Sequence, residues 1–145
     1  MIKKIFKVAW AVSLLAMVVV FIYSYASWPP EVNLGGEARG LGIDKNILFY
    51  VCLGLSGLFN ALVFVVTRMN FSEAFGTWFY GLVISFHIFF ITSSIFITIL
   101  NSSERYDYSM IGPTVYMSIG LLLFSIVAWP IYLVVRKFMV QSRNG

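Results

Sequence analysis

Four long apolar runs constrain this chain more than any other feature of its sequence. A helix needs ~20 mostly apolar residues to cross a membrane, because it rises ~1.5 Å per residue through ~30 Å of hydrocarbon. Four segments reach that length, at about residues 8–27, 47–67, 77–100 and 111–135. The sequence therefore predicts an all-α polytopic membrane protein whose four transmembrane helices form a bundle.

The composition leaves little material for a soluble domain. Of 145 residues, 60% are hydrophobic and 11% are charged, which is more apolar surface than one soluble core of this size buries. We expect a single transmembrane domain over residues 1–145, with outer loops at about 28–46 and 101–110. The first loop contains four glycines and is expected to be flexible or tightly turned. Basic residues are scattered around the apolar runs, so no nucleic-acid partner is expected.

The basic residues also predict the orientation of the chain. Cytoplasmic loops of membrane proteins carry an excess of Lys and Arg. With the N-terminus inside, seven basic residues face the cytoplasm and three lie outside. The seven are Lys3, Lys4, Lys7, Arg68, Arg136, Lys137 and Arg143, and the three are Arg39, Lys45 and Arg105. We expect both termini in the cytoplasm and a multi-pass location in a bacterial inner membrane.

The first apolar run has an alternative interpretation. Basic residues precede it and Ser24-Tyr25-Ala26 follows it, which is the pattern of a cleaved secretory signal. The run is longer than the apolar region of a typical signal peptide, so we favour an uncleaved anchor helix. Cleavage would leave three spans and place the new N-terminus outside.

Several residues mark the expected helix ends. Pro29 and Pro30 stop the first helix, because proline removes a donor and disfavours helix in the preceding residue. Asp44 is the expected N-cap of the second helix. Pro130 predicts a kink near the end of the fourth helix. Asn101, in Asn-Ser-Ser, is interpreted as part of a helix-ending cluster rather than a glycosylation site.

His87 is the titratable exception within the spans, which contain no Asp, Glu, Lys or Arg. A histidine at membrane depth suggests a haem or metal ligand, a proton carrier or a contact to a quinone-like group. With no second histidine or carboxylate beside it, a multi-ligand metal site cannot be assembled. The favoured interpretation is a neutral histidine that hydrogen-bonds a neighbouring helix or subunit. We expect no catalytic residue, no metal and no cofactor.

Three further polar residues lie at a similar depth to His87. At ~1.5 Å per residue, Ser125 and His87 lie ~15 Å from the inner ends of their helices, and Ser13 and Asn60 lie ~10 Å from the inner face. We expect Ser13, Asn60, His87 and Ser125 to form a polar layer across the inner half of the bundle. Asn60 and His87 should face the interior or a partner chain, never bare lipid.

Small residues predict close packing of the first two helices, because helices in lipid associate through contact between small side chains. Each helix carries such residues at spacings of three and four. They are Ala9, Ser13 and Ala16 on the first helix and Gly54, Gly57 and Ala61 on the second. We expect these two stripes to pack together within one chain. The alternative is a dimer contact of the small-xxx-small type.

The third helix is rich in phenylalanine, with Phe86, Phe89, Phe90 and Phe96 among β-branched isoleucines. Its outer half presents bulk on nearly every side, which suits lipid or the groove of another subunit. The hydroxyl run Thr92-Ser93-Ser94 has no general base within a helical turn and is expected to bond back to helix carbonyls.

These observations favour a non-enzymatic accessory or interaction subunit of a larger bacterial inner-membrane complex. The expected partners are other membrane protein subunits and the lipid bilayer. The main alternative is a small homo-oligomeric permeation or transport unit, in which Asn60, His87 and Ser125 line a shared path. A third possibility, a membrane enzyme acting on a lipid, would use the acidic residues of the outer loops.

Overall fold

Four helices make up nearly all of the computed structural model, which describes residues 2–34, 42–69, 71–102 and 111–141. They are α1 (Ile2–Ser27), α2 (Lys45–Arg68), α3 (Glu73–Leu100) and α4 (Gly112–Gln141). Each is long and apolar enough to cross a membrane. The expectation of four membrane-spanning helices is therefore confirmed at the level of helix length and composition. Arg39, Arg105 and Arg143, which enter the predicted orientation, lie outside the described residues.

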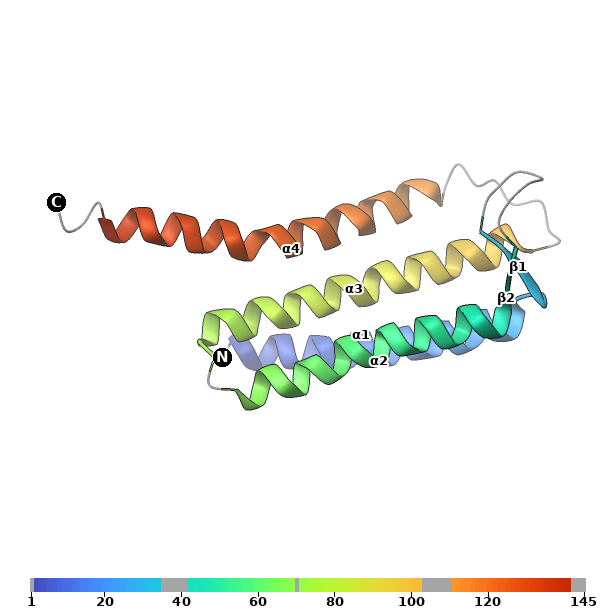
Figure 1. Ribbon diagram of the computed structural model, residues 1–145, viewed down its shortest axis with the longest axis horizontal. Coiled ribbons are helices and arrows are strands. Elements are labelled where there is room, and N and C mark those ends of the chain that lie inside the picture. The colour runs from blue at the N-terminus through green and yellow to red at the C-terminus, as the bar shows by residue number, and fades with distance from the viewer. Residues whose placement is uncertain (1, 35–41, 70, 103–110, 142–145) are drawn as a thin grey trace.

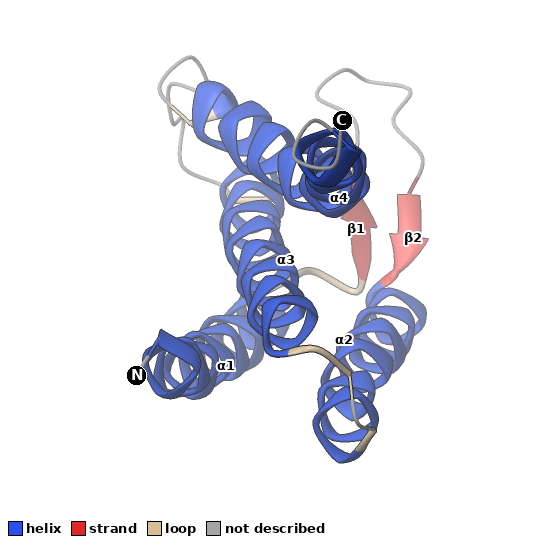
Figure 2. Ribbon diagram, turned by 90° about the vertical axis from the view of Figure 1, so that its left-hand side faces the viewer, coloured by secondary structure: helices blue, strands red, loops and turns tan. Residues whose placement is uncertain are grey.

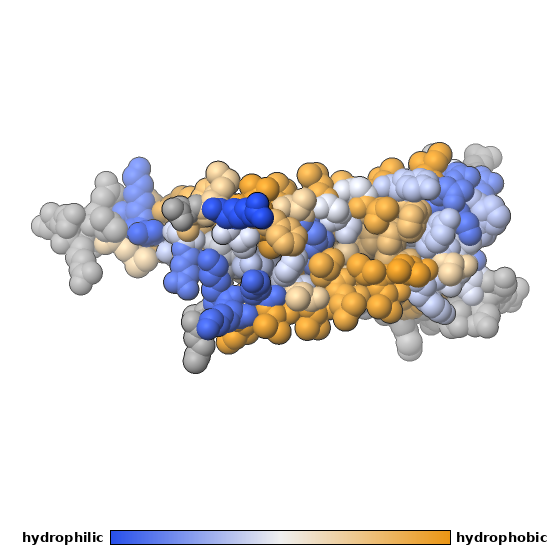
Figure 3. All heavy atoms as spheres, turned by 90° about the horizontal axis from the view of Figure 1, so that it is seen from below, coloured by the Kyte–Doolittle hydropathy of each residue, from blue (hydrophilic) through white to orange (hydrophobic). Residues whose placement is uncertain are grey.

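The surface of the molecule matches a chain that lies in a membrane. Hydrophilic side chains gather toward the two ends, and a broad hydrophobic band separates them (Figure 3). Successive helices run in opposite directions, so the two ends of the chain lie at the same end of the molecule (Figure 1). We call this the terminal end, and the opposite one the hairpin end.

Helix α3 occupies the middle of the arrangement. The other three helices surround it, with α1 and α2 on one side and α4 on the other (Figure 2). In α3, 33% of the apolar span is buried inside the structure, against 11% in each of the other helices. Helices α1 and α4 make the most extensive contacts with α3, and α2 makes fewer. The fold is therefore organised around α3.

The aromatic core lies where α1, α2 and α3 meet. Phe86 stacks on Phe59 with ring centroids 4.2 Å apart, and Phe90 contacts the edge of Phe21 at 5.1 Å. Both α3 phenylalanines are buried. The expectation that the outer half of α3 suits lipid or another subunit is therefore wrong at Phe90, because Phe21 on α1 packs against this side chain.

The small-residue stripes of α1 and α2 do not pack together. A Cβ added at Gly54 or Gly57 would meet nothing within 4 Å. Ala9, Ala16 and Ala61 are exposed. The backbones of α1 and α2 approach each other less closely than either approaches α3. The expected pairing within one chain is wrong, because bulky side chains and the central helix hold α1 and α2 apart. A dimer contact through these residues stays a prediction.

A short β-hairpin lies between α1 and α2 and was not expected from the glycine-rich loop. Strands β1 (Glu31–Asn33) and β2 (Gly42–Asp44) are antiparallel, with Val32 opposite Ile43. Val32 is fully buried. Asn101 fixes β1 to the end of α3, because its side chain accepts from Asn33 N at 2.8 Å and donates to Asn33 O at 2.9 Å.

The helix ends agree with the signals in the sequence. Helix α1 ends at Ser27, shortly before the two prolines. The Asp44 side chain accepts hydrogen bonds from Asn46 N at 2.8 Å and Ile47 N at 3.3 Å, so its predicted role as N-cap is confirmed. Asn101 is the C-cap of α3. Helix α4 contains Pro130, as expected, but ends at Gln141 and not near residue 135.

Candidate functional site

Three helices meet at the imidazole of His87, whose side chain is completely buried. Ser13 on α1 places its hydroxyl oxygen 2.8 Å from His87 Nδ1. Asn60 on α2 places its Nδ2 atom 3.2 Å from His87 Nε2. The structure therefore brings together three of the four residues of the expected polar layer.

The contacts of Asn60 fix which nitrogen of His87 carries the proton. Asn60 Oδ1 accepts from Trp10 Nε1 at 3.0 Å, and Asn60 Nδ2 donates to Ser56 O at 2.9 Å. Because an indole nitrogen only donates and a carbonyl oxygen only accepts, the amide has one possible orientation. His87 Nε2 therefore accepts from Asn60, and Nδ1 carries the hydrogen and donates to Ser13.

The hydrogen bonds close into a ring. The Ser13 hydroxyl donates in turn to Trp10 O at 2.9 Å, which returns the chain of bonds to the residue that began it. We call Trp10, Ser13, Asn60 and His87 the His87 network. If Nε2 carried the proton, this proton would point at the NH₂ group of Asn60, which is also a donor. Turning the amide to present its oxygen to Nε2 would place Nδ2 against the Trp10 N–H, and two donors would again face each other. The His87 network is therefore complete with a neutral imidazole.

This arrangement joins helices and leaves neither nitrogen of His87 free for a ligand. A haem or metal ligand needs an unshared nitrogen lone pair, and Asn60 occupies the one that His87 has. Among the described residues, no group of three or more His, Cys, Asp or Glu side chains could hold a metal ion. Buried polar groups that are fully paired in this way fix the register of neighbouring helices.

Ser125 belongs to a different contact. Its hydroxyl lies 2.7 Å from that of Ser85, and its carbonyl accepts from Trp78 Nε1 at 2.7 Å. About two helical turns toward the hairpin end, Thr92 Oγ1 lies 2.8 Å from Ser118 Oγ. We call these contacts the hydroxyl ladder. It attaches α4 to α3, so Ser125 does not line a path with His87.

The polar layer expected from the sequence does not include Ser85, Thr92 or Ser118. A signal for them exists in the spacing, because Trp78, Ser85 and Thr92 recur every seven residues on α3, and Ser118 and Ser125 do so on α4. Seven residues are nearly two helical turns, so such residues share one face. Thr92 Oγ1 also lies 3.0 Å from Ile88 O, which confirms the back-bonding expected for that residue.

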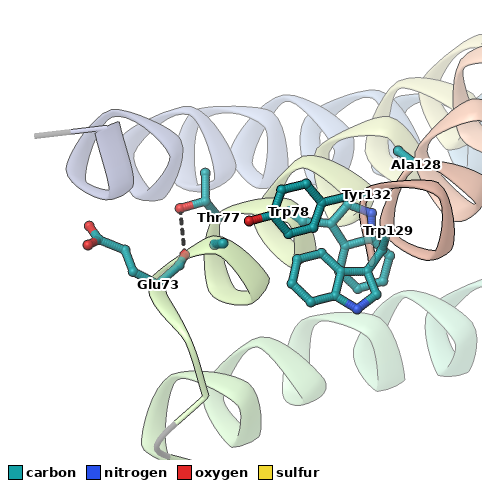
Figure 4. A pocket seen from close by; sticks show the side chains of 7 residues that line it. Glu73, Thr77, Trp78, Ala128, Trp129 and Tyr132 are labelled. Carbon is teal, nitrogen blue, oxygen red and sulfur yellow. Dashed lines mark hydrogen bonds between the residues drawn. The ribbon is translucent and has the colours of Figure 1, made fainter. Parts of the chain in front are cut away.

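A cleft lies between α3 and α4 near the terminal end (Figure 4). It has a volume of about 700 Å³. Its lining residues are Glu73, Ala74, Thr77, Trp78, Ala128, Trp129 and Tyr132. Trp78 stacks on Trp129 with ring centroids 5.5 Å apart, and Tyr132 stacks on Trp129 with ring centroids 5.3 Å apart.

Comparison with protein-family models, with curated proteins and with solved structures finds no match for this chain. Its function is therefore inferred from the contacts of its own residues. The His87 network and the hydroxyl ladder hold helices together. The cleft and the end of α4 instead have exposed surface that other molecules can contact.

Proposed function

We propose that this chain is a non-enzymatic accessory or interaction subunit of a larger bacterial inner-membrane complex, with both termini in the cytoplasm. The observation that carries the proposal is the last part of α4. Every residue from 130 to 139 is exposed. Phe138 and Met139 are 67% and 60% exposed. We call residues 130–139 the α4 extension.

The length of α4 carries this extension beyond the rest of the molecule. The stacking of Trp78 on Trp129 places these two residues at the same level. From that level α3 continues ~8 Å to Glu73, whereas α4 continues ~18 Å to Gln141, at 1.5 Å per residue. Helix α4 therefore projects about 10 Å past the start of α3. Figure 1 shows that the end of α4 lies beyond the start of α3.

The sequence of the α4 extension indicates that lipid does not cover the apolar side chains at its end. Arg136 and Lys137 precede Phe138 and Met139, and such charged side chains reside at the head-group region or in water. Apolar side chains beyond them lie outside the hydrocarbon layer. A protein partner that packs on Phe138 and Met139 removes this apolar surface from water.

The distribution of charge supports the proposed orientation. Lys3, Lys4, Lys7 and Arg68 lie at the terminal end, together with the Arg136-Lys137 pair. Among the basic residues that the structure describes, Lys45 is the one at the hairpin end. Basic residues favour the cytoplasmic side of a membrane, so the terminal end is proposed to face the cytoplasm.

Purification in a gentle detergent at the native expression level tests this proposal. We expect a larger unrelated membrane complex to elute with the chain in a fixed ratio, as identified by mass spectrometry. Phe138→Ala should release the complex. The matched control is Phe124→Ala, because Phe124 is 70% exposed on the same helix but lies at membrane depth. A clean homo-oligomer, or equal effects of the two variants, would overturn the proposal.

A further inference from the structure

We infer that the cleft between α3 and α4 binds the head group of a zwitterionic phospholipid that carries a primary ammonium, as phosphatidylethanolamine does. The cleft combines aromatic faces and unused polar atoms with one acidic residue, Glu73, and Arg136 follows Tyr132 by four residues on α4. This inference does not rest on the proposed protein partner, because that partner packs on Phe138 and Met139, whereas the lining of the cleft reaches only Tyr132 on α4.

The inner part of the cleft is apolar and rigid. Trp78 is fixed by its bond to Ser125 O at 2.7 Å, and Trp129 stacks on both Trp78 and Tyr132. Phe75 adds an edge contact to Trp129 at 5.1 Å. Indole and phenol rings at the boundary of a membrane favour the region where acyl chains meet head groups. The ring cluster is therefore suited to the glycerol and upper acyl part of a lipid.

The rim of the cleft is polar. Glu73 begins α3, and its carboxylate extends away from the rings (Figure 4). The Tyr132 hydroxyl points to the side of the cleft where Thr77 and Glu73 lie (Figure 4). Within the described part of the chain, the Glu73 carboxylate, the Tyr132 hydroxyl and Trp129 Nε1 have no hydrogen-bond partner. One acceptor and two donors are therefore available to a head group.

The charges at this rim distinguish a zwitterion from an anion. Glu73 is the one acidic residue that the structure describes at the terminal end. Arg136 lies four residues beyond Tyr132, on the same face of α4. A head-group ammonium pairs with Glu73, and the phosphate accepts hydrogen bonds from Tyr132 and Arg136. An anionic lipid without an ammonium leaves Glu73 close to its phosphate without compensation.

Several features separate this site from a ring of interfacial aromatic residues that lacks lipid preference. Interfacial aromatic side chains in general face the surrounding lipid. Here rings from two helices converge on one cleft of about 700 Å³, within the size range of small-molecule sites. A non-specific aromatic surface would treat all lipids alike, whereas the cleft should select by head group.

Tryptophan quenching by brominated lipids tests the inference directly. The purified chain is placed in phosphatidylcholine vesicles that contain the same small share of either dibrominated phosphatidylethanolamine or dibrominated phosphatidylglycerol. We expect stronger quenching by the first lipid and a smaller excess in Trp129→Phe, in which Trp78 is the remaining tryptophan of the cleft. Equal quenching by both lipids, or stronger quenching by phosphatidylglycerol, would overturn the inference. Trp129→Phe keeps a ring at this position, so it preserves the stacked cluster.

Native mass spectrometry with the same two lipids tests the role of Glu73. We expect Glu73→Gln to lower the retention of phosphatidylethanolamine about 3-fold, the scale of one exposed ion pair, and to leave phosphatidylglycerol unchanged. Glu31→Gln is the matched control, because Glu31 is an exposed acid at the hairpin end. Equal effects of the two variants would contradict the inference. Displacement of the lipid by dodecyltrimethylammonium at equal concentration would show recognition of a cation alone and would also overturn it.

Discussion

Replacement of Asn60 by alanine should release α2 from the other helices. Asn60 joins α2 to α1 through Trp10 and to α3 through His87, with bonds of 3.0 and 3.2 Å. Helix α2 has less contact with α3 than α1 or α4 has, so these bonds are a large part of its attachment. A hydrogen bond between membrane helices contributes ~0.6 to 1.7 kcal/mol. The loss of two should cost about 2 kcal/mol, or ~30-fold in the unfolding equilibrium constant.

Unfolding in detergent micelles with increasing dodecyl sulfate, followed by tryptophan fluorescence, measures this cost. Asn46→Ala is the matched control, because Asn46 is an exposed asparagine on the same helix and accepts one bond from the Tyr25 hydroxyl. We expect the control to change stability by less than ~0.5 kcal/mol. If Asn60→Ala destabilises the chain no more than Asn46→Ala, the His87 network does not hold α2, and the reasoning is refuted.

Three more predictions concern the other polar contacts. Ser85→Ala and Ser125→Ala should each lower stability by ~0.6 to 1.7 kcal/mol, and the double variant should cost little more than either, because the two hydroxyls share one bond; additive losses in the same unfolding assay would contradict the ladder. His87 should show a protonated Nδ1 and a bare Nε2 by nitrogen NMR at neutral pH, and an imidazolium spectrum would exclude the His87 network as described. Asn101→Ala should speed hydrogen exchange of the Asn33 amide roughly tenfold, because it removes the acceptor of that amide; unchanged protection would show that Asn101 does not hold β1.

The sequence predicts where the helices lie along the chain better than it predicts which helices pack together. Span length and apolar content depend on local residues alone, so all four helices could be located. The ends marked by Asp44 and by Pro29 are local signals as well. Pro130 lies inside α4, as expected, but the helix ends at Gln141 and not near residue 135. Helices in membranes tolerate proline when neighbouring groups satisfy the freed carbonyl.

The packing partners of each helix could not be predicted, because apolar side chains suit both lipid and protein. Phe86 and Phe90 are buried in the core, but a phenylalanine would suit a position that faces lipid equally well. In lipid, hydrophobicity no longer separates the inside of a bundle from its outside. Gly54 and Gly57 illustrate the converse, since small residues permit close packing but do not require it.

The polar residues carried more information, because each must find a partner at its own depth. Depth counting placed Ser13 and Asn60 near His87, and the structure joins all three. The same counting placed Ser125 at the level of His87 but gave no helix face, and Ser125 bonds Ser85 instead. A seven-residue spacing of Ser and Thr on two helices is the signal that identifies the hydroxyl ladder.

Photo-crosslinking from position 138 in living cells tests the proposed subunit role most directly. A photoreactive phenylalanine derivative replaces Phe138 in one strain and Phe124 in another, because the two side chains are similarly exposed on α4. We predict a covalent adduct with a different membrane protein from position 138 and no protein adduct from position 124. The absence of a protein adduct at position 138, or an adduct only with a second copy of this chain, would contradict the account.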